Sequence, residues 1–147
     1  MNKELTLKDV IEVAYSLAVR YLQYDQPIVE YERAKHEIDM GKLESAIRAP
    51  FHTLKGKYLI NGFYMRAGAL FYYLSKSHAL MNGNKRLAVT SLMVFMAKNN
   101  KWINIPHERL IEISIMIASS DRKVKNIMIE TTSKEIRRFT VSSVGNV

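Results

Sequence analysis

The sequence of 147 residues has no cysteine, only 3 prolines and no run of about 20 apolar residues. Without cysteine there is neither a disulfide framework nor a thiolate site, so a metal ion would be held by histidine, asparagine or carboxylate groups. The missing apolar run, and the lack of an apolar signal core in residues 1–10, predict no membrane association and a cytoplasmic location.

The composition is that of an ordinary folded protein. Apolar residues make up 48%, charged residues 24%, and there are 6 glycines, which excludes disordered and collagen-like chains. The length fits one domain with its own core, which we place over residues 1–147.

The overall charge is positive, with 22 Lys+Arg against 14 Asp+Glu and a net charge of +8. Such a charge attracts nucleic acid, nucleotides or acidic proteins. The basic residues are dispersed, however, in short groups such as 122–125, and no five-residue basic run occurs. A solvated basic surface is therefore favoured, and nucleic acid is not the expected partner.

The spacing of apolar residues predicts an all-α fold of five to seven helices around one buried central helix. Thr6 and Asp9 resemble a capping box at the start of the first helix. The predicted helices cover residues 7–22, a short segment from Asp39 to before Pro50, 63–77, 87–100 as the central helix, a segment from about Pro106 through Ile117, and 121–138. We expect the tail after Phe139 to be frayed.

Residues 50–62 interrupt the helical pattern. Gly56 and Asn61-Gly62 enclose four residues, 57–60, which suit a loop or a small hairpin. Several other prominent side chains are interpreted as core packing instead of cofactor contacts: Tyr72, Tyr73, Met93, Met96 and Trp102.

The segment His78-Ala-Leu-Met-Asn82-Gly83-Asn84-Lys85-Arg86 has more polar groups than a plain connector between two apolar helices needs. Gly83 permits a tight turn, so the N–H groups of residues 83–85 can converge at the start of the next helix and bind an anion such as phosphate. Lys85 and Arg86 add positive charge there, which opposes the helix dipole unless an anion binds.

His78 ends the preceding helix and can exchange a proton near neutral pH, as a general base must. A lone histidine at a helix end is usually a cap, and Asn-Gly-Asn is usually a turn. Together, at this spacing beside a buried helix, the residues favour a nucleotide site with a base, which implies group transfer.

The same residues resemble the core motif of the Fic/Doc family, HxFx(D/E)GN(G/K)R, and the NKR ending resembles its Doc (death-on-curing) branch. Residues 41–50, GKLESAIRAP, are similar to a segment of Doc proteins, and the resemblance covers about residues 36–120. It implies an all-α Fic fold that uses ATP and Mg²⁺ to modify a hydroxyl side chain of a target protein.

The resemblance also implies roles for individual residues. His78 would be the general base, Asn82 the metal-ligand position, and the phosphates would be held by Gly83, Asn84, Lys85 and Arg86. Asn82 departs from the usual carboxylate, which predicts weaker metal binding. Leu80 stands in place of the usual Phe, a mild change.

Two further differences bear on the reaction. Family members that transfer AMP carry Gly and a second Arg where this chain has Lys85 and Val89, and in Doc-like proteins the lysine accompanies transfer of the terminal phosphate. The resemblance thus favours a kinase of the Doc type, a toxin of a toxin-antitoxin or prophage-maintenance system. Its target class would be translation elongation factor Tu, and an antitoxin would neutralise it.

Residues 50–62 correspond to the family's flap, which aligns a target by strand addition. Lys55, Lys57 and Tyr58 would contact the target there, although a solvated basic loop explains them equally well. Two alternatives to the kinase stay open: a Fic-type protein adenylyltransferase, and a catalytically weakened relative that only binds nucleotide or nucleic acid.

Overall fold

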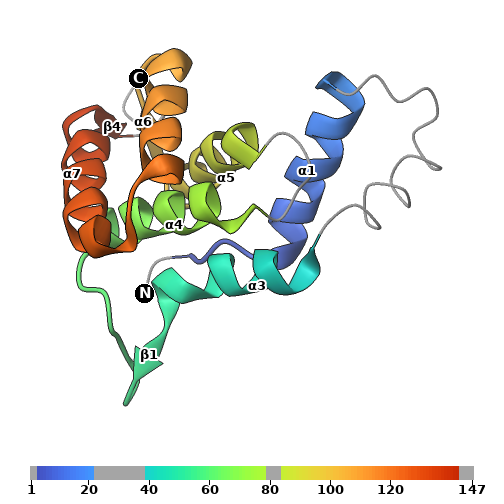
Figure 1. The fold of residues 1–147 in the computed structure, drawn as a ribbon. Coiled ribbons are helices and arrows are strands. Elements are labelled where there is room, and N and C mark those ends of the chain that lie inside the picture. Colours follow the sequence, from blue (N-terminus) through green and yellow to red (C-terminus); the bar gives the residue numbers. More distant parts are fainter. Residues whose placement is uncertain (1–2, 22–38, 79–83, 143–147) are drawn as a thin grey trace.

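Six α-helices carry the fold in a computed structural model that describes residues 3–21, 39–78 and 84–142 (Figure 1). The helices are α1 (Leu7–Tyr21), α3 (Met40–Arg48), α4 (Phe63–Ser77), α5 (Asn84–Lys98), α6 (His107–Ser119) and α7 (Lys125–Arg138), with two short 3₁₀ helices, η1 (Ala49–Phe51) and η2 (Arg122–Val124). The all-α prediction is confirmed. Within the described ranges, none of the helices has the length and apolar character that a membrane span requires.

Local signals in the sequence account for where α1, α3 and α4 begin, whereas α7 begins at Lys125, after the 3₁₀ helix η2, and not at the predicted residue 121. Thr6 and Asp9 form the predicted capping box at α1, since each backbone N–H donates to the other side chain, at 2.9 and 3.1 Å. Asp39 caps α3 by accepting from the Lys42 N–H at 3.0 Å. Helix α4 has the bounds expected from its apolar spacing.

Helix α4 lies at the centre of the bundle and packs against α3, α5, α6 and α7. The apolar character of residues 87–100 predicts this central position for that segment, and the prediction is wrong. Helix α5 instead keeps an exposed face at Lys85, Arg86 and Ala97, whereas nearly all of the middle of α4 is buried. The difference arises because Ala67, Gly68 and Ala69 are small enough for neighbouring helices to approach α4 from several sides.

The crossing of α4 and α7 depends on Gly68. A Cβ atom at this position would lie 2.1 Å from the Ser133 Oγ and 2.9 Å from the Ile129 carbonyl oxygen. The Ser133 hydroxyl donates to that same carbonyl at 2.6 Å. Glycine therefore lets the two helix backbones come closer than any other residue would allow.

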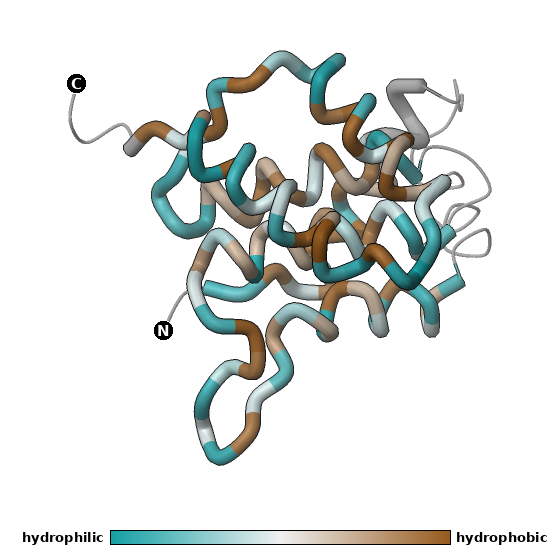
Figure 2. Tube along the Cα trace, turned by 60° about the vertical axis from the view of Figure 1, so that its left-hand side comes forward, coloured by the Kyte–Doolittle hydropathy of each residue, from teal (hydrophilic) through white to brown (hydrophobic). Residues whose placement is uncertain are grey.

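The predicted small hairpin is present and consists of β1 (Thr53–Leu54) and β2 (Lys57–Tyr58). Its turn residues, Lys55 and Gly56, have φ angles of 51° and 76°, as a type I′ turn requires. The hairpin projects from the helical body, and Figure 2 shows both hydrophilic and hydrophobic residues along it.

A second antiparallel pair was not anticipated. β3 (Lys101–Ile103) pairs with β4 (Thr140–Ser142), so Trp102 lies opposite Val141. The expectation of a frayed tail is therefore wrong for residues 140–142. It rested on local sequence, whereas β4 is held by a partner some 40 residues earlier in the chain.

The expectation that Trp102 is packed in the core is also wrong, because 52% of this residue is exposed. Tyr72 and Met96 are buried as predicted, and Tyr73 and Met93 are half-buried.

Candidate functional site

His78 caps the C-terminal end of α4 in a left-handed conformation, with φ 48° and ψ 35°. A residue other than glycine pays about 1 kcal/mol or more for this conformation, although histidine is among those that adopt it more often. The His78 side chain is exposed. The left-handed cap stops α4 and leaves the imidazole open to solvent.

The turn of α4 before His78 is firmly held. The buried hydroxyls of Ser75 and Ser114 are hydrogen-bonded at 2.8 Å, which joins α4 to α6. Lys76 Nζ donates to the Ser120 carbonyl at the end of α6, and Ser77 Oγ donates to the Leu74 carbonyl at 3.0 Å. These contacts fix the backbone from which the imidazole projects.

Helix α5 begins at Asn84 and ends at Lys98, whereas the predicted helix covers 87–100. Lys85 and Arg86 are exposed, and the described first turn contains no acidic residue. The dipole of a helix makes its N-terminus positive, so each cation there costs about 0.3 to 1 kcal/mol. An anion bound at this end would be attracted by the helix dipole and by both cations, which would offset their unfavourable effect on the helix.

The two flanks of the predicted motif belong to helices that pack against each other. His78 ends one helix and Asn84 begins the next, so the five residues between them can span at most about 20 Å. Asn82, the predicted metal position, and Gly83, the predicted turn glycine, fall in residues 79–83, outside the described residues.

Position 89 differs from the rest of this end of α5. Val89 is only 3% exposed and packs in the core, whereas Lys85 one turn earlier is exposed. The side chain at position 89 therefore cannot contact an external ligand, and Lys85 can.

The hairpin residues predicted to dock a target divide into two kinds. Lys55 and Lys57 are exposed at the turn. Tyr58 turns back against the body, where its ring packs on Phe51, 6.3 Å between centroids, and under the Arg66 guanidinium at 4.2 Å. Its buried hydroxyl has no hydrogen-bond partner among the described residues. The side chain of Tyr58 thus anchors the hairpin.

The surroundings of Tyr58 also affect its ionisation. Burial raises the pKa of Tyr58 above 10.0, the Glu4 carboxylate raises it further, and Arg66 partly opposes both. The phenol therefore stays protonated over the physiological range.

Arg66 was not singled out in the sequence, although it supports the hairpin. It is 7% exposed, and its Nη1 donates to the Ile60 carbonyl at 2.9 Å, just after the hairpin. The available signal was a single arginine within the apolar run FYMRAGAL of α4. A cation in such a run is buried only when polar groups hydrogen-bond to it or an aromatic ring packs against it.

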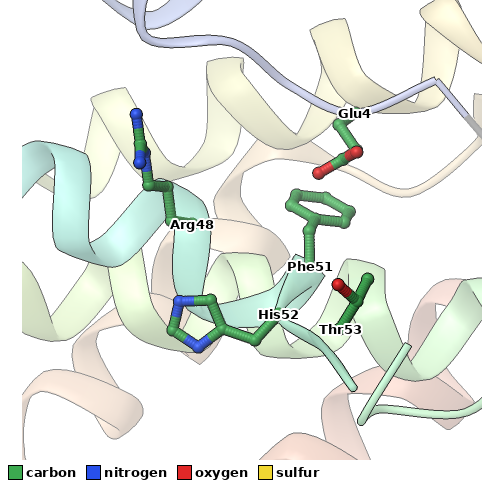
Figure 3. Close-up of a pocket in the computed structure, with 5 residues that line it drawn as sticks. All are labelled: Glu4, Arg48, Phe51, His52 and Thr53. Atoms are coloured by element: carbon green, nitrogen blue, oxygen red, sulfur yellow. The ribbon is translucent and has the colours of Figure 1, made fainter. Parts of the chain in front are cut away.

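A hollow of about 440 Å³ lies beside the base of the hairpin (Figure 3). Its lining comes from the N-terminal segment, the end of α3, η1 and β1: Glu4, Arg48, Phe51, His52 and Thr53. Figure 3 shows the Glu4 carboxylate over the Phe51 ring. None of these residues was predicted to form a site, and Arg48 is paired with Glu44 at 2.8 Å.

The part of the chain that the structure describes contains no cluster of carboxylates that could hold a metal ion by itself. No group of three or more His, Asp or Glu residues there could hold one. Mg²⁺ on a nucleotide is usually held by phosphate oxygens plus one or two protein ligands. Asn82, the predicted protein ligand, lies outside the described residues.

The chain is similar to a known protein family. A family model described as Fic/DOC family matches residues 4–96, which include α1, the hairpin, α4 and nearly all of α5. The match begins earlier and ends sooner than the range of 36–120 implied by the resemblance. No curated protein and no solved structure matches.

Members of this family are typically transferases that use ATP and a metal. The family model covers well over half of the chain, including both flanks of the motif. The chain belongs to the Fic/DOC family.

Proposed function

We propose that the chain is a Doc-like protein kinase that transfers the terminal phosphoryl group of ATP to a hydroxyl side chain of a target protein. The observation that carries the proposal is the contrast within α5. Lys85 is exposed in the first turn of α5, the described helix that follows the His78 end of α4, while Val89 is buried. The site therefore has a base and a cation for a terminal phosphate, and lacks the second arginine of the AMP-transferring pattern.

In this reaction a nitrogen of the His78 imidazole takes the proton of the target hydroxyl. The hydroxyl oxygen attacks the γ-phosphorus and forms the new P–O bond. The bond from the γ-phosphorus to the bridging oxygen breaks, and its electron pair leaves with ADP. Placing an exposed imidazole on a fixed helix end suits this role, because proton transfer needs accurate positioning of the base.

The N-terminus of α5 would hold the phosphates. The N–H groups of its first turn and the charges of Lys85 and Arg86 all favour an anion there. Gly83 and Asn84 complete the predicted phosphate-binding set. Mg²⁺, with Asn82 as its predicted protein ligand, would supply charge neutralisation of the phosphates.

The target would approach along the hairpin, with its backbone aligned by strand addition and acidic groups facing Lys55 and Lys57. We propose elongation factor Tu as the target to test first, and a toxin neutralised by an antitoxin as the biological setting. Both follow from the likeness of the motif to the Doc branch.

The test is incubation of the purified chain with ATP, Mg²⁺ and purified elongation factor Tu, and in parallel with a bacterial extract, followed by intact-protein and peptide mass spectrometry. A phosphoryl increment on a hydroxyl side chain supports the proposal. A nucleotidyl increment would instead show an adenylyltransferase, and ATP binding without any modification would show a non-catalytic relative.

His78→Ala should lower the rate by about 10²- to 10⁴-fold, as expected for loss of a general base. His107→Ala, which removes another exposed histidine at the start of α6, is the matched control and should leave the rate unchanged. Full activity of His78→Ala would show that another group is the base.

A further inference from the structure

The small β3–β4 sheet has an unusual outer face. Trp102 is 52% exposed, and its cross-strand neighbour Val141 is 47% exposed. Residues at alternate positions turn inward, where Ile103 is buried. A sheet whose outer face met only water would carry polar residues at those two positions. The exposed apolar pair therefore indicates a surface that is covered by something else.

The sheet also offers one strand edge, that of β4. The Asn104 N–H donates to the Phe139 carbonyl at 2.7 Å, and in an antiparallel pair hydrogen-bonded positions alternate. Trp102 and Val141 are then the next hydrogen-bonded pair, and Thr140 and Ser142 direct their backbone N–H and C=O groups to the outer edge of β4. The outer edge of β3 is closed at Ile103, which is buried. In the described part of the chain, this sheet has two strands and no third strand pairs with either edge.

Positive charge borders the sheet. Lys101 lies over the Phe63 ring at 5.3 Å, Arg137 over the Tyr64 ring at 5.8 Å, and Arg138 over the Phe139 ring at 5.4 Å. Among the described residues, none of these three cations forms an ion pair with a carboxylate. The sheet thus combines an exposed tryptophan, open backbone groups and three cations.

We propose that this sheet binds an extended acidic segment of a partner protein by strand addition, with an apolar side chain of the segment packed on Trp102. The backbone of the segment would pair with the outer edge of β4, its apolar side chain would lie beside Val141 and Trp102, and its carboxylates would lie near Arg137 and Arg138. Tryptophan and arginine are the residues that most often dominate such interfaces.

Two other occupants fit less well. A second copy of the chain would bring the same cations face to face. A single-stranded nucleic acid could stack on Trp102 and contact the cations, but it would leave the alternating N–H and C=O groups of the strand edge without the matching pattern that a peptide backbone supplies. The surface is separate from the β1–β2 hairpin, since Figure 1 shows β4 and β1 on opposite sides of the molecule.

Trp102 is the only tryptophan in the chain, so its fluorescence reports directly on this surface. The probe is a blocked peptide of alternating glutamate and valine, added to the full chain at low salt. We expect a blue shift of the emission and a dissociation constant between about 1 μM and 1 mM, the range of weak peptide interactions. No change in emission up to about 1 mM would overturn the proposal.

Two control peptides test the two parts of the proposal. Replacing every glutamate by lysine tests the charge, and replacing alternate residues by proline removes the N–H groups needed for strand addition. Both should bind at least tenfold more weakly. Equal binding of either one, or tighter binding of an oligothymidylate than of the acidic peptide, would contradict an acidic strand as the occupant.

Variants locate the binding surface when a labelled acidic peptide is followed by fluorescence anisotropy. Trp102→Ala and the double charge reversal Arg137→Glu/Arg138→Glu should each weaken binding about tenfold. Ile127→Ala is the matched control, because Ile127 is another exposed apolar residue, on α7, and it should change nothing. If Ile127→Ala weakens binding as much as Trp102→Ala, the peptide binds elsewhere.

Discussion

Positive charge is buried near the start of helix α4 and exposed just beyond its end. Near the start of α4, Arg66 is buried, donates a hydrogen bond to the Ile60 carbonyl and lies over the Tyr58 ring. Beyond its end, Lys85 and Arg86 are exposed at the dipole-positive start of α5. The contacts of Arg66 stabilise the fold. The cations at the start of α5 oppose the helix dipole and lower stability, and a bound anion would remove this unfavourable effect. Substitutions at the packed end should therefore affect stability, and those at the open end should affect binding.

The largest effect is expected at the packed part of α4. Gly68→Ala should lower the free energy of unfolding by about 2 kcal/mol, because the new Cβ meets Ser133 and the Ile129 carbonyl and forces α4 and α7 apart, which outweighs the better helix propensity of alanine. Urea denaturation followed by circular dichroism measures this.

The control for Gly68→Ala is Gly41→Ala. A Cβ at Gly41, also within a helix, would meet only Asp39 Oδ1 at an ordinary 3.6 Å. This variant should be neutral or stabilising by about 0.5 kcal/mol. Equal destabilisation by both substitutions would show that the close α4–α7 crossing is not the cause.

Arg66→Met should cost about 1.5 kcal/mol, because it removes the charged hydrogen bond to the Ile60 carbonyl and the contact with Tyr58. The hairpin should also become more accessible to protease, which limited proteolysis would detect. A variant as stable and as resistant as the parent would mean that Arg66 does not hold the hairpin.

Tyr58→Phe is the companion of Arg66→Met. It removes a buried hydroxyl that has no partner among the described residues, so stability at neutral pH should stay the same or rise slightly. Because the pKa of Tyr58 is raised in the folded state, stability is retained below pH 10.0 and falls as the pH rises through the folded pKa. Tyr58→Phe should reduce this alkaline loss, leaving the part that Tyr72, whose pKa is also raised, contributes.

The ion pair of Asp9 and Lys98, 2.6 Å apart, is an intermediate case in which a partly exposed cation has a partner. Asp9→Asn should cost about 1 kcal/mol at neutral pH through the loss of this pair and weakening of the α1 cap. A double-mutant cycle with Lys98→Met separates the two contributions.

The pH dependence follows from the surroundings of Asp9. Burial by itself raises the pKa of Asp9, but hydrogen bonds from Lys98 and Thr6 outweigh it, and the pKa is lowered from 3.8. The contribution of Asp9 is therefore complete above pH 3.8 and is lost as the pH falls through the folded pKa. The parent and Asp9→Asn should converge in stability in acid; a difference that persists there would refute an ionic origin.

The smallest change in stability is expected at the open end. Lys85→Ala should raise the free energy of unfolding by about 0.5 kcal/mol, because it removes a cation from a helix N-terminus. The same change should weaken ATP binding, measured by titration calorimetry. Lys134→Ala, on α7, should leave ATP binding unaltered. If Lys85→Ala destabilises the chain without affecting ATP, the two ends of α4 do not differ in the way described.

Most helices could be predicted because their signals are local. Capping at Thr6 and Asp39 and the apolar spacing of 63–77 act within a few residues, and the structure has the corresponding helices. The family, too, follows from a short motif together with its flanks. In the site, the exposed His78 and Lys85 lie where the pattern expects the end of one helix and the start of the next.

Other features depended on residues that are distant in sequence. The pairing of β3 with β4 joins segments about 40 residues apart, and it turns Trp102 outward against the usual expectation for tryptophan. The inward orientation of Tyr58 depends on Arg66, and the central position of α4 depends on how closely α7 approaches Gly68. Periodicity along one segment cannot show which other segment will pack against it.

The sequence by itself thus determined the helical class, the capped starts of α1 and α3, the bounds of α4 and the motif that places a histidine before a basic helix start, because caps, turns and apolar spacing act over short distances along the chain. Only the tertiary structure decided which helix is central, which cations are buried and which tryptophan face stays open. These outcomes depend on the packing of segments far apart in sequence, where the space left by small residues such as Gly68 selects the neighbour.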